Sequence, residues 1–302
     1  MKNKKKIKIL ITGAKGQDGI LLSKKLVSKN YRVFGLVKNI KYKNKIDKIS
    51  YFPINLKNKK KVKQFILKIK PEIIVHFGSE NPSHDERAKK KNFFNENYNN
   101  SKNLINSSLD LNKKVFFIFT SSSLIFKKKY GVVYEKDKFK IKDSYSKFRI
   151  KILKYLNSIK NKNFFYSNLI LFNHDSKYRN EKFLLPKLIN AIKNNDTNFI
   201  KEIYKSNIVG DFSHAEDICD AIYLIIKKKI ILKNLILSSG KKTRINYLIN
   251  YLLKKYKLKI KLNIPIVKRK CLVGNNNLAR NKIKWKIKKN IFIAADEIYR
   301  NI

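Results

Sequence analysis

The chain has 302 residues, enough to bury one large hydrophobic core or two modest ones. Its 71 lysines and arginines against 21 acidic residues give a formal charge of +50. It has no run of 18 or more apolar residues, so we expect no membrane span, and the basic N-terminal stretch runs straight into a glycine turn, so we expect no signal peptide. Two cysteines and four scattered histidines give neither a disulfide framework nor metal-ligand spacing, so we expect no metal site and a cytoplasmic location.

The positive charge is spread along the whole chain rather than gathered on one predicted face. Lysine is abundant in nearly every segment, together with asparagine and isoleucine. A dedicated nucleic-acid surface would concentrate its basic residues in a patch or a stripe. We therefore expect solvated lysines that attract anionic substrates, and no specific nucleic-acid partner.

The first predicted element is the most informative. An apolar strand over 6–12 is followed by the sequence GAKGQDG at 13–19 and then by a helix. Gly13 permits a tight turn, Gly16 lets the backbone approach a pyrophosphate, and Gly19 lets the helix pack closely on the strand. The free N–H groups at the helix start would bind the anion. This context predicts a dinucleotide site; the alternative is an ordinary strand-to-helix turn.

The later elements alternate between short apolar strands and amphipathic helices. Strands are predicted over 31–37, 51–56, 72–77, 115–120, 166–172 and 235–238, and helices over 18–28, 59–69, 97–109, 146–158 and 214–227. This order predicts an α/β fold, a doubly wound parallel Rossmann sheet covered on both faces. We expect residues 1–172 to form the cofactor-binding domain, with 207–240 returning to it, and 173–206 and 241–302 to form a smaller, mostly helical substrate lobe.

Two positions at predicted strand ends and a pair of residues on a predicted helix suggest the chemistry. The second strand ends at Lys38, a cation that would suit the 2′-phosphate of NADP, with NAD as the alternative. The fifth strand leads to Ser122, whose hydroxyl can hydrogen-bond a substrate hydroxyl. Tyr145 and Arg149 share one face of the following helix. A cation there favours the phenolate, which could exchange a proton with a sugar hydroxyl while a hydride moves to nicotinamide.

Together these motifs resemble the extended short-chain dehydrogenase/reductase family, and within it the GDP-mannose 4,6-dehydratase branch. The GAKGQDG loop is similar to that branch's glycine loop, including its Gln-Asp pair. LFNHDS at 171–176 and DFSHAED at 211–217 are similar to two further blocks, and LARNKIKWK at 278–286 looks like the usual C-terminal end of extended members. The resemblance covers nearly the whole chain.

The resemblance implies a role for each matching residue. It implies catalytic roles for Ser122, Tyr145 and Arg149, and places the diphosphate end of a nucleotide sugar, GDP-linked in this branch, at Asn173 and Lys187. It implies cofactor contacts at Gly13, Gly16, Gln17, Asp18, Gly19, Lys38, Asn55, Leu56, Phe77, Gly78, Ser79, His174 and Arg179. Family members pair through helices equivalent to 97–109 and 146–158, so a homodimer or a tetramer is expected.

Three departures from the family pattern bear on activity. Arg149 replaces the lysine that follows the catalytic tyrosine, Leu124 replaces a glutamate that serves as the base for the C5 proton, and Gly210 replaces an arginine that grips the diphosphate. From the resemblance we expect an enzyme, a GDP-mannose 4,6-dehydratase-like lyase. Because of these departures, a nucleotide-sugar 4-reductase or epimerase and a non-catalytic NADP-binding relative stay open as alternatives. The whole-chain similarity supports the lyase, and the missing glutamate supports the reductase or epimerase. The altered residues 149 and 210 support the non-catalytic relative.

Overall fold

The structure, a computed structural model, describes residues 6–38, 46, 48–80, 92–262 and 265–302. Its centre is a seven-stranded sheet in which every described pair of neighbours is parallel. The strand order is β10-β7-β5-β4-β1-β2-β3. The strands are β1 (Lys8–Thr12), β2 (Arg32–Val37), β3 (Ile49–Pro53), β4 (Ile73–His76), β5 (Val115–Ser122), β7 (Phe164–Leu171) and β10 (Asn234–Leu237). The predicted Rossmann-type α/β fold is confirmed.

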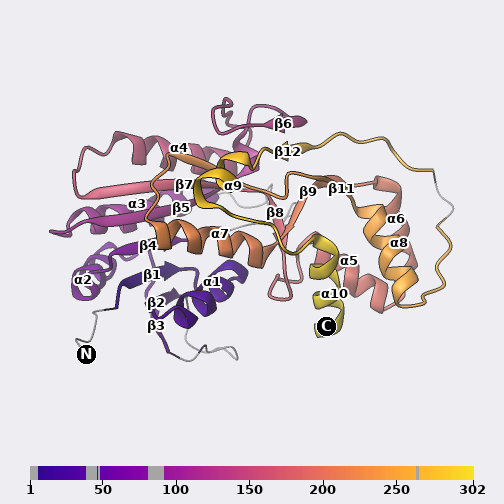
Figure 1. The fold of residues 1–302 in the computed structure, drawn as a ribbon, viewed down its shortest axis with the longest axis horizontal. Helices are drawn as coiled ribbons and strands as arrows, with labels where there is room; N and C mark the ends of the chain where they lie inside the picture. The colour runs from indigo at the N-terminus through magenta and orange to yellow at the C-terminus, as the bar shows by residue number, and fades with distance from the viewer. Residues whose placement is uncertain (1–5, 39–45, 47, 81–91, 263–264) are drawn as a thin grey trace.

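Two layers of helices cover the sheet (Figure 1). Consecutive residues of β1 pack into opposite layers. On one face, Ile9 and Ile11 of β1 pack with α1 (Gln17–Ser28), α7 (Ala215–Lys228) and α9 (Asn277–Ile283). On the other face, Leu10 packs with α2 (Lys59–Ile69), α3 (Phe93–Leu109) and α4 (Ser144–Ser158). Both faces of β1 are therefore buried, which explains its unbroken apolar run.

A second group of helices lies together at one end of the molecule (Figure 1). These are α5 (Leu184–Lys193), α6 (Thr197–Ser206), α8 (Ile245–Lys255) and α10 (Ile291–Asn301), which bury a separate apolar cluster. The structure also has two small sheets: β8 (Asn173–Asp175), β9 (Val209–His214) and β11 (Lys242–Arg244) form one, and β6 (Gly131–Val133) and β12 (Leu272–Gly274) the other. A 3₁₀ turn, η1 (Ser123–Ile125), follows β5.

Element boundaries differ from the sequence predictions at several points. The third strand ends at Pro53 rather than at residue 56, because Asn55 accepts a hydrogen bond from the Lys57 N–H at 3.0 Å and turns the chain towards α2. Helix α3 begins at Phe93, four residues before its predicted start. Strands β6, β8, β9, β11 and β12 fall outside the predicted strands. Four of these have only three residues, too few for a period to show.

Local capping residues fix the helix that carries the predicted catalytic pair. Asp143 accepts a hydrogen bond from the Ser146 N–H at 2.7 Å, and the Ser146 hydroxyl accepts one from the Asp143 N–H at 3.0 Å. This reciprocal cap starts α4 one residue before Tyr145. Tyr145 and Arg149 consequently lie on successive turns of a helix whose first turn is fixed.

The glycine turn gives the first testable prediction. A Cβ on Gly19 would lie 2.3 Å from the Gly13 carbonyl oxygen and 2.7 Å from Ala14 Cα, both backbone atoms that cannot easily move. We expect Gly19→Ala to lower the free energy of unfolding by about 1–3 kcal/mol. Gly16→Ala is the matched control, because its Cβ would meet only the Gly13 oxygen, at 3.3 Å. Urea denaturation of the two variants measures this, and equal stability would contradict the packing role of Gly19.

Candidate active site

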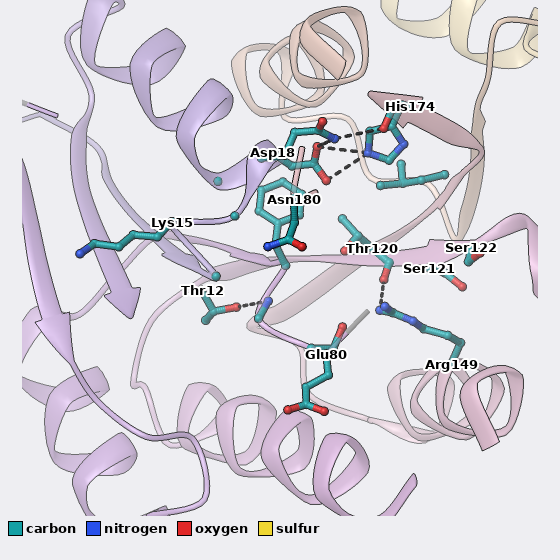
Figure 2. Close-up of a pocket in the computed structure, with 18 of the residues that line it drawn as sticks. Thr12, Lys15, Asp18, Glu80, Thr120, Ser121, Ser122, Arg149, His174 and Asn180 are labelled. Carbon is teal, nitrogen blue, oxygen red and sulfur yellow. Dashed lines mark hydrogen bonds and ion pairs between the residues drawn. The ribbon is translucent and has the colours of Figure 1, made fainter. Parts of the chain in front are cut away.

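A cavity of about 840 Å³ lies at the carboxyl ends of the central parallel strands (Figure 2). It is lined by the ends of β1, β2, β5 and β7, by the segment after β4, by the start of α1, and by α4 and the segment after β8. The strand order reverses its direction between β1 and β4, and ligands of open α/β sheets bind at this point. The lining includes every residue that the sequence predicted for the site except Lys187.

Close backbone packing forms the floor of the cavity at the glycine turn. Gly13 has φ +69°, and a Cβ there would lie 3.0 Å from the Phe77 carbonyl carbon. A Cβ on Gly78 would lie 2.6 Å from Thr12 Oγ1. The turns after β1 and β4 therefore approach each other more closely than side chains would allow. The start of α1 opens onto this floor, as a pyrophosphate site requires.

A buried ion pair lies at the first turn of α1. His174 Nε2 is 3.1 Å from both carboxylate oxygens of Asp18, and His174 Nδ1 lies 2.6 Å from the Phe172 carbonyl oxygen. The Gln17 side chain donates to the His174 carbonyl oxygen at 3.1 Å, and Ser176 donates to Gln17 at 3.1 Å. The QDG sequence of the glycine loop is thus bonded to the LFNHDS block, across 156 residues of sequence (Figure 2).

Electrostatics favour the charged form of both members of this pair. Burial raises the pKa of Asp18, but His174, with smaller contributions from Arg179 and Gln17, brings that pKa below its usual value. Burial lowers the pKa of His174, but the Asp18 carboxylate outweighs it and raises the pKa above the usual value. The pair therefore consists of a positively charged His174 imidazolium and a negatively charged Asp18 carboxylate, next to the predicted pyrophosphate site.

The predicted catalytic group lies at the other end of the cavity. Arg149 Nη2 donates to the Tyr145 hydroxyl at 3.2 Å, and Arg149 Nη1 donates to the Thr120 carbonyl oxygen at 2.6 Å. The guanidinium also lies over the rings of Phe148 and Tyr145, at 4.8 and 5.0 Å. These contacts hold the positive charge next to the Tyr145 ring, as the sequence predicted, and direct the Nη1 group of Arg149 towards β5.

The neighbouring strand end brings Ser122 and Leu124 into the same cavity. Both residues line it, and the Ser122 hydroxyl accepts a hydrogen bond from the Leu124 N–H at 3.3 Å. The side chain at position 124 is therefore placed at the cavity wall but cannot accept a proton. Among the described lining residues, the carboxylates are those of Asp18 and Glu80.

The predicted adenosine end carries the end of β2 and the segment after β3. Lys38 forms an ion pair with Glu80 at 3.3 Å, and its side chain is 89% exposed. Asn55 and Leu56 line the cavity, although they follow β3 in a turn rather than ending it. Lys15, which the sequence did not single out, also lines the cavity, and its Nζ lies 5.5 Å from the centroid of the Tyr51 ring.

The residues predicted for the substrate diphosphate are separated in the structure. Asn173 lines the cavity and donates to the Asp211 carbonyl oxygen at 3.4 Å. Lys187 lies on α5, is exposed, and is not a lining residue. Arg179 does line the cavity, 3.0 Å from Asp175 and 3.6 Å above the Phe183 ring. The roles of Asn173 and Lys187 stay predictions.

Several lining residues escaped the sequence reasoning. They include Thr12, Lys15, Glu80, Asn100, Thr120, Asn180 and Phe183. Thr12 and Thr120 could have been found, because each ends or nearly ends a predicted strand at the edge where ligands bind. Asn180 and Phe183 lie beyond β8, in a segment without a strand pattern. No group of three or more metal-ligating side chains gathers in the part of the chain that the structure describes.

The glycine turn, the cavity at the switch point and the tyrosine–arginine pair define a Rossmann-fold protein of the extended short-chain dehydrogenase/reductase class. A family model described as GDP-mannose 4,6 dehydratase matches residues 10–297, and the chain belongs to this family. The family comprises nucleotide-sugar dehydratases and epimerases that bind a nicotinamide dinucleotide. A comparison with curated proteins gave no match. None of the described helices is long and apolar enough to cross a membrane.

Solved structures share the fold at low sequence identity. The structure is similar to UDP-glucose 4-epimerase from Thermotoga maritima with UDP-glucose, at 16% identity and a TM-score of 0.80, over 98% of each chain. It is also similar to UDP-glucose-4-epimerase from Stenotrophomonas maltophila with bound NAD and formylated UDP-arabinopyranose, at 13% identity and a TM-score of 0.79, over 98% of this chain and 97% of that one. The Thermus thermophilus UDP-glucose 4-epimerase in complex with NAD gives 13% identity and a TM-score of 0.79, over 98% of each chain.

The Asp18–His174 pair predicts a pH dependence of stability. The pKa of His174 is raised on folding, so its protonated form stabilises the folded protein. This contribution to the free energy of unfolding is fully present below the unfolded pKa of about 6.5 and is lost as pH rises through the folded pKa. His174→Gln keeps a hydrogen-bond donor but removes the charge. We expect wild type to exceed this variant in unfolding free energy by on the order of 3 kcal/mol near pH 6, and by less above pH ~8.

Urea denaturation of both proteins between pH 5 and ~9 measures this difference. In wild type the lower limit stays above the folded pKa of Asp18, which is itself lowered, so the wild-type carboxylate remains charged throughout. A difference in stability that is constant across this range would show that His174 does not carry a charge in the folded protein.

Proposed function

We propose that the protein transfers a hydride between C4 of a nucleotide-linked sugar and a nicotinamide cofactor, as a nucleotide-sugar 4-epimerase or 4-reductase. The observation that carries the proposal is the placement of the Tyr145–Arg149 pair and Ser122 at one end of a cavity whose other end is the glycine turn. An extended dinucleotide anchored at the turn would bring its nicotinamide towards this pair. Belonging to the GDP-mannose 4,6 dehydratase family supports a nucleotide-sugar substrate.

The residues present fit a dinucleotide. The cradle between Gly13 and Gly78 is one that a Cβ would fill, and the first turn of α1 faces the cavity. The N–H groups at the start of α1, in a turn that Gln17 and protonated His174 hold in place, would meet the pyrophosphate. Lys38 would meet a 2′-phosphate, which favours NADP over NAD. When bound, the nicotinamide accepts or returns the hydride.

The proton and the hydride leave the sugar on separate routes. In the oxidation, the C4–H bond breaks and its electron pair leaves with the hydride, while the C4 hydroxyl proton passes to the Tyr145 oxygen. Arg149 stabilises the phenolate that receives this proton, and Ser122 hydrogen-bonds the same sugar hydroxyl. In the reduction the same groups return the proton to the C4 oxygen. Epimerisation is this exchange carried out on both faces of C4.

Loss of water across C5 and C6 is the second candidate, because the family description names a dehydratase. That reaction needs a base for the C5 proton, which contributes about 10²–10⁴-fold. Leu124 lies at the cavity wall where the family's glutamate would be, and the Asp18 carboxylate is engaged by His174. The site is therefore better equipped for exchange at C4 than for elimination. A GDP-linked substrate and pairing of two copies through α3 and α4 stay predictions.

The decisive experiment identifies the product. Purified protein with NADP(H) is offered GDP-mannose, its 4-epimer and its 4-keto-6-deoxy derivative, and the products are read by mass spectrometry and NMR. We expect inversion at C4 with unchanged mass, or reduction of the keto sugar by two hydrogens. Loss of one water from wild type would establish the dehydratase instead, and no turnover with cofactor bound would establish a non-catalytic relative.

Matched variants tie that activity to the site. Tyr145→Phe should lower kcat about 10²–10⁴-fold, because the proton acceptor is removed. Tyr155→Phe is the control on the same helix, since its hydroxyl bonds Asn106 away from the cavity. Leu124→Glu should add measurable water loss to the products. Equal kcat for the two tyrosine variants would contradict the assigned role of Tyr145.

Cofactor preference can be tested at the adenosine end. If Lys38 meets the 2′-phosphate, Lys38→Ala should raise the Kd of NADP about tenfold and that of NAD less than about twofold. Lys63→Ala is the control, because Lys63, like Lys38, is an exposed lysine that forms an ion pair with a carboxylate, that of Asp110, but it lies outside the cavity. Equal loss of NADP and NAD affinity in Lys38→Ala would refute the contact.

A further inference from the structure

A histidine that lines no part of the cavity connects its floor to a helix behind it. His76 is the last residue of β4 and is 1% exposed. Its Nδ1 lies 2.7 Å from Thr12 Oγ1, and its Nε2 lies 2.9 Å from the hydroxyl of Ser101 on α3. Thr12 Oγ1 in turn accepts the Gly78 N–H at 2.9 Å, as Figure 2 shows. Thr12 and Ser101 are each 1% exposed, so water is excluded from this chain of bonds.

The direction of each hydrogen bond follows from the ends of the chain. The Ser101 hydroxyl donates to the Asn97 carbonyl oxygen at 2.8 Å, so it accepts from His76 Nε2–H. Nδ1 is then unprotonated and accepts from the Thr12 hydroxyl, whose remaining lone pair accepts the Gly78 N–H. Burial, and then the positive charge of Arg149, lower the pKa of His76 to about 3. The His76 imidazole is therefore neutral near neutral pH. A neutral ring has one donor and one acceptor nitrogen, which matches the bonds that Nε2 and Nδ1 make here.

The same helix also holds the next part of the cavity floor. Asn97 Oδ1 accepts the Glu80 N–H at 2.8 Å, and Asn97 Nδ2 donates to the Phe93 carbonyl oxygen at 2.8 Å. The segment from Gly78 to Glu80 is therefore tied at one end through Thr12 and His76, and at the other end directly to α3. Gly78, Glu80 and Thr12 all line the cavity, whereas His76 and Ser101 do not.

A branch from His76 reaches the catalytic end. The Thr120 hydroxyl donates to the His76 carbonyl oxygen at 2.9 Å, and the Thr120 carbonyl oxygen accepts from Arg149. The ring also packs against Phe117 and Phe119, with centroids 6.0 and 6.1 Å away. These contacts fix the position of His76, and His76 can therefore fix the orientation of the residues to which it is hydrogen-bonded.

We propose that His76 is a positioning residue for the dinucleotide: by orienting the Thr12 hydroxyl, it holds the Gly78–Glu80 segment at the spacing from the glycine turn that the dinucleotide needs. This inference rests on the proposed cofactor site but not on the identity of the sugar or the reaction. A hydroxyl at position 12 that is free to rotate would leave the Gly78 N–H without a fixed acceptor. The floor would then have to be ordered when the dinucleotide binds, at a cost in affinity.

The test measures the Kd of NADP and of NAD without any sugar, so it does not depend on turnover. His76→Phe keeps an aromatic ring but deletes both nitrogens, and should raise both Kd values about fivefold or more. Because that variant could fold poorly, Ser101→Ala and Ser107→Ala form a second, matched pair. Both serines are buried on α3 and donate to the carbonyl four residues earlier, but His76 bonds only Ser101 among these two.

We expect Ser101→Ala and Ser107→Ala to lose similar stability in urea, and only Ser101→Ala to weaken dinucleotide binding. A Kd for Ser101→Ala equal to that for Ser107→Ala would overturn the inference, whatever the stability of His76→Phe. Wild type that binds dinucleotide but converts no sugar would overturn the proposed function alone. Wild type that binds neither NADP nor NAD would overturn both.

Discussion

The close approach of two backbone turns, after β1 and after β4, is the constraint on which the rest of the site depends. Gly13 and Gly78 meet where any Cβ would lie within about 3 Å of the facing chain. This contact is possible only because the two strands are parallel neighbours that end at the same edge. It opens the first turn of α1 towards the cavity, and the ion pair between Asp18 and His174 then joins that turn to the segment after β7.

Charge inside the cavity is organised differently from charge on the surface. The chain has a formal charge of +50, and most of it lies on exposed lysines that salt and water screen. The cavity instead holds His174 and Arg149 in buried positions at its two ends, each bound to one oxygen-bearing side chain. These two cations are desolvated and fixed in direction, so each interacts with a neighbouring negative charge far more strongly than surface lysines do.

Sequence patterns predicted the sheet because the central strands β1, β4 and β5 are buried on both faces and therefore form continuous apolar runs in the sequence. The glycine turn and the Tyr145–Arg149 spacing were equally readable, since each is a local backbone feature. Three-residue strands such as β8 and β12 were not, because they are formed by pairing between distant segments. The second hydrogen bond of Arg149, to Thr120, and the outward position of Lys187 depend on how helices dock, which no local pattern encodes. The His76 chain likewise joins residues from three separate elements.

The central claim is the proposed hydride exchange at C4 of a nucleotide sugar. The direct measurement uses a nucleotide sugar carrying deuterium at C4 and follows the label in a single turnover with stoichiometric NADP and NAD. The account predicts that deuterium appears on the nicotinamide ring bound to wild type, and that Tyr145→Phe abolishes the transfer. If neither NADP nor NAD acquires deuterium from any nucleotide sugar tested, although the cofactor is bound, the account is contradicted.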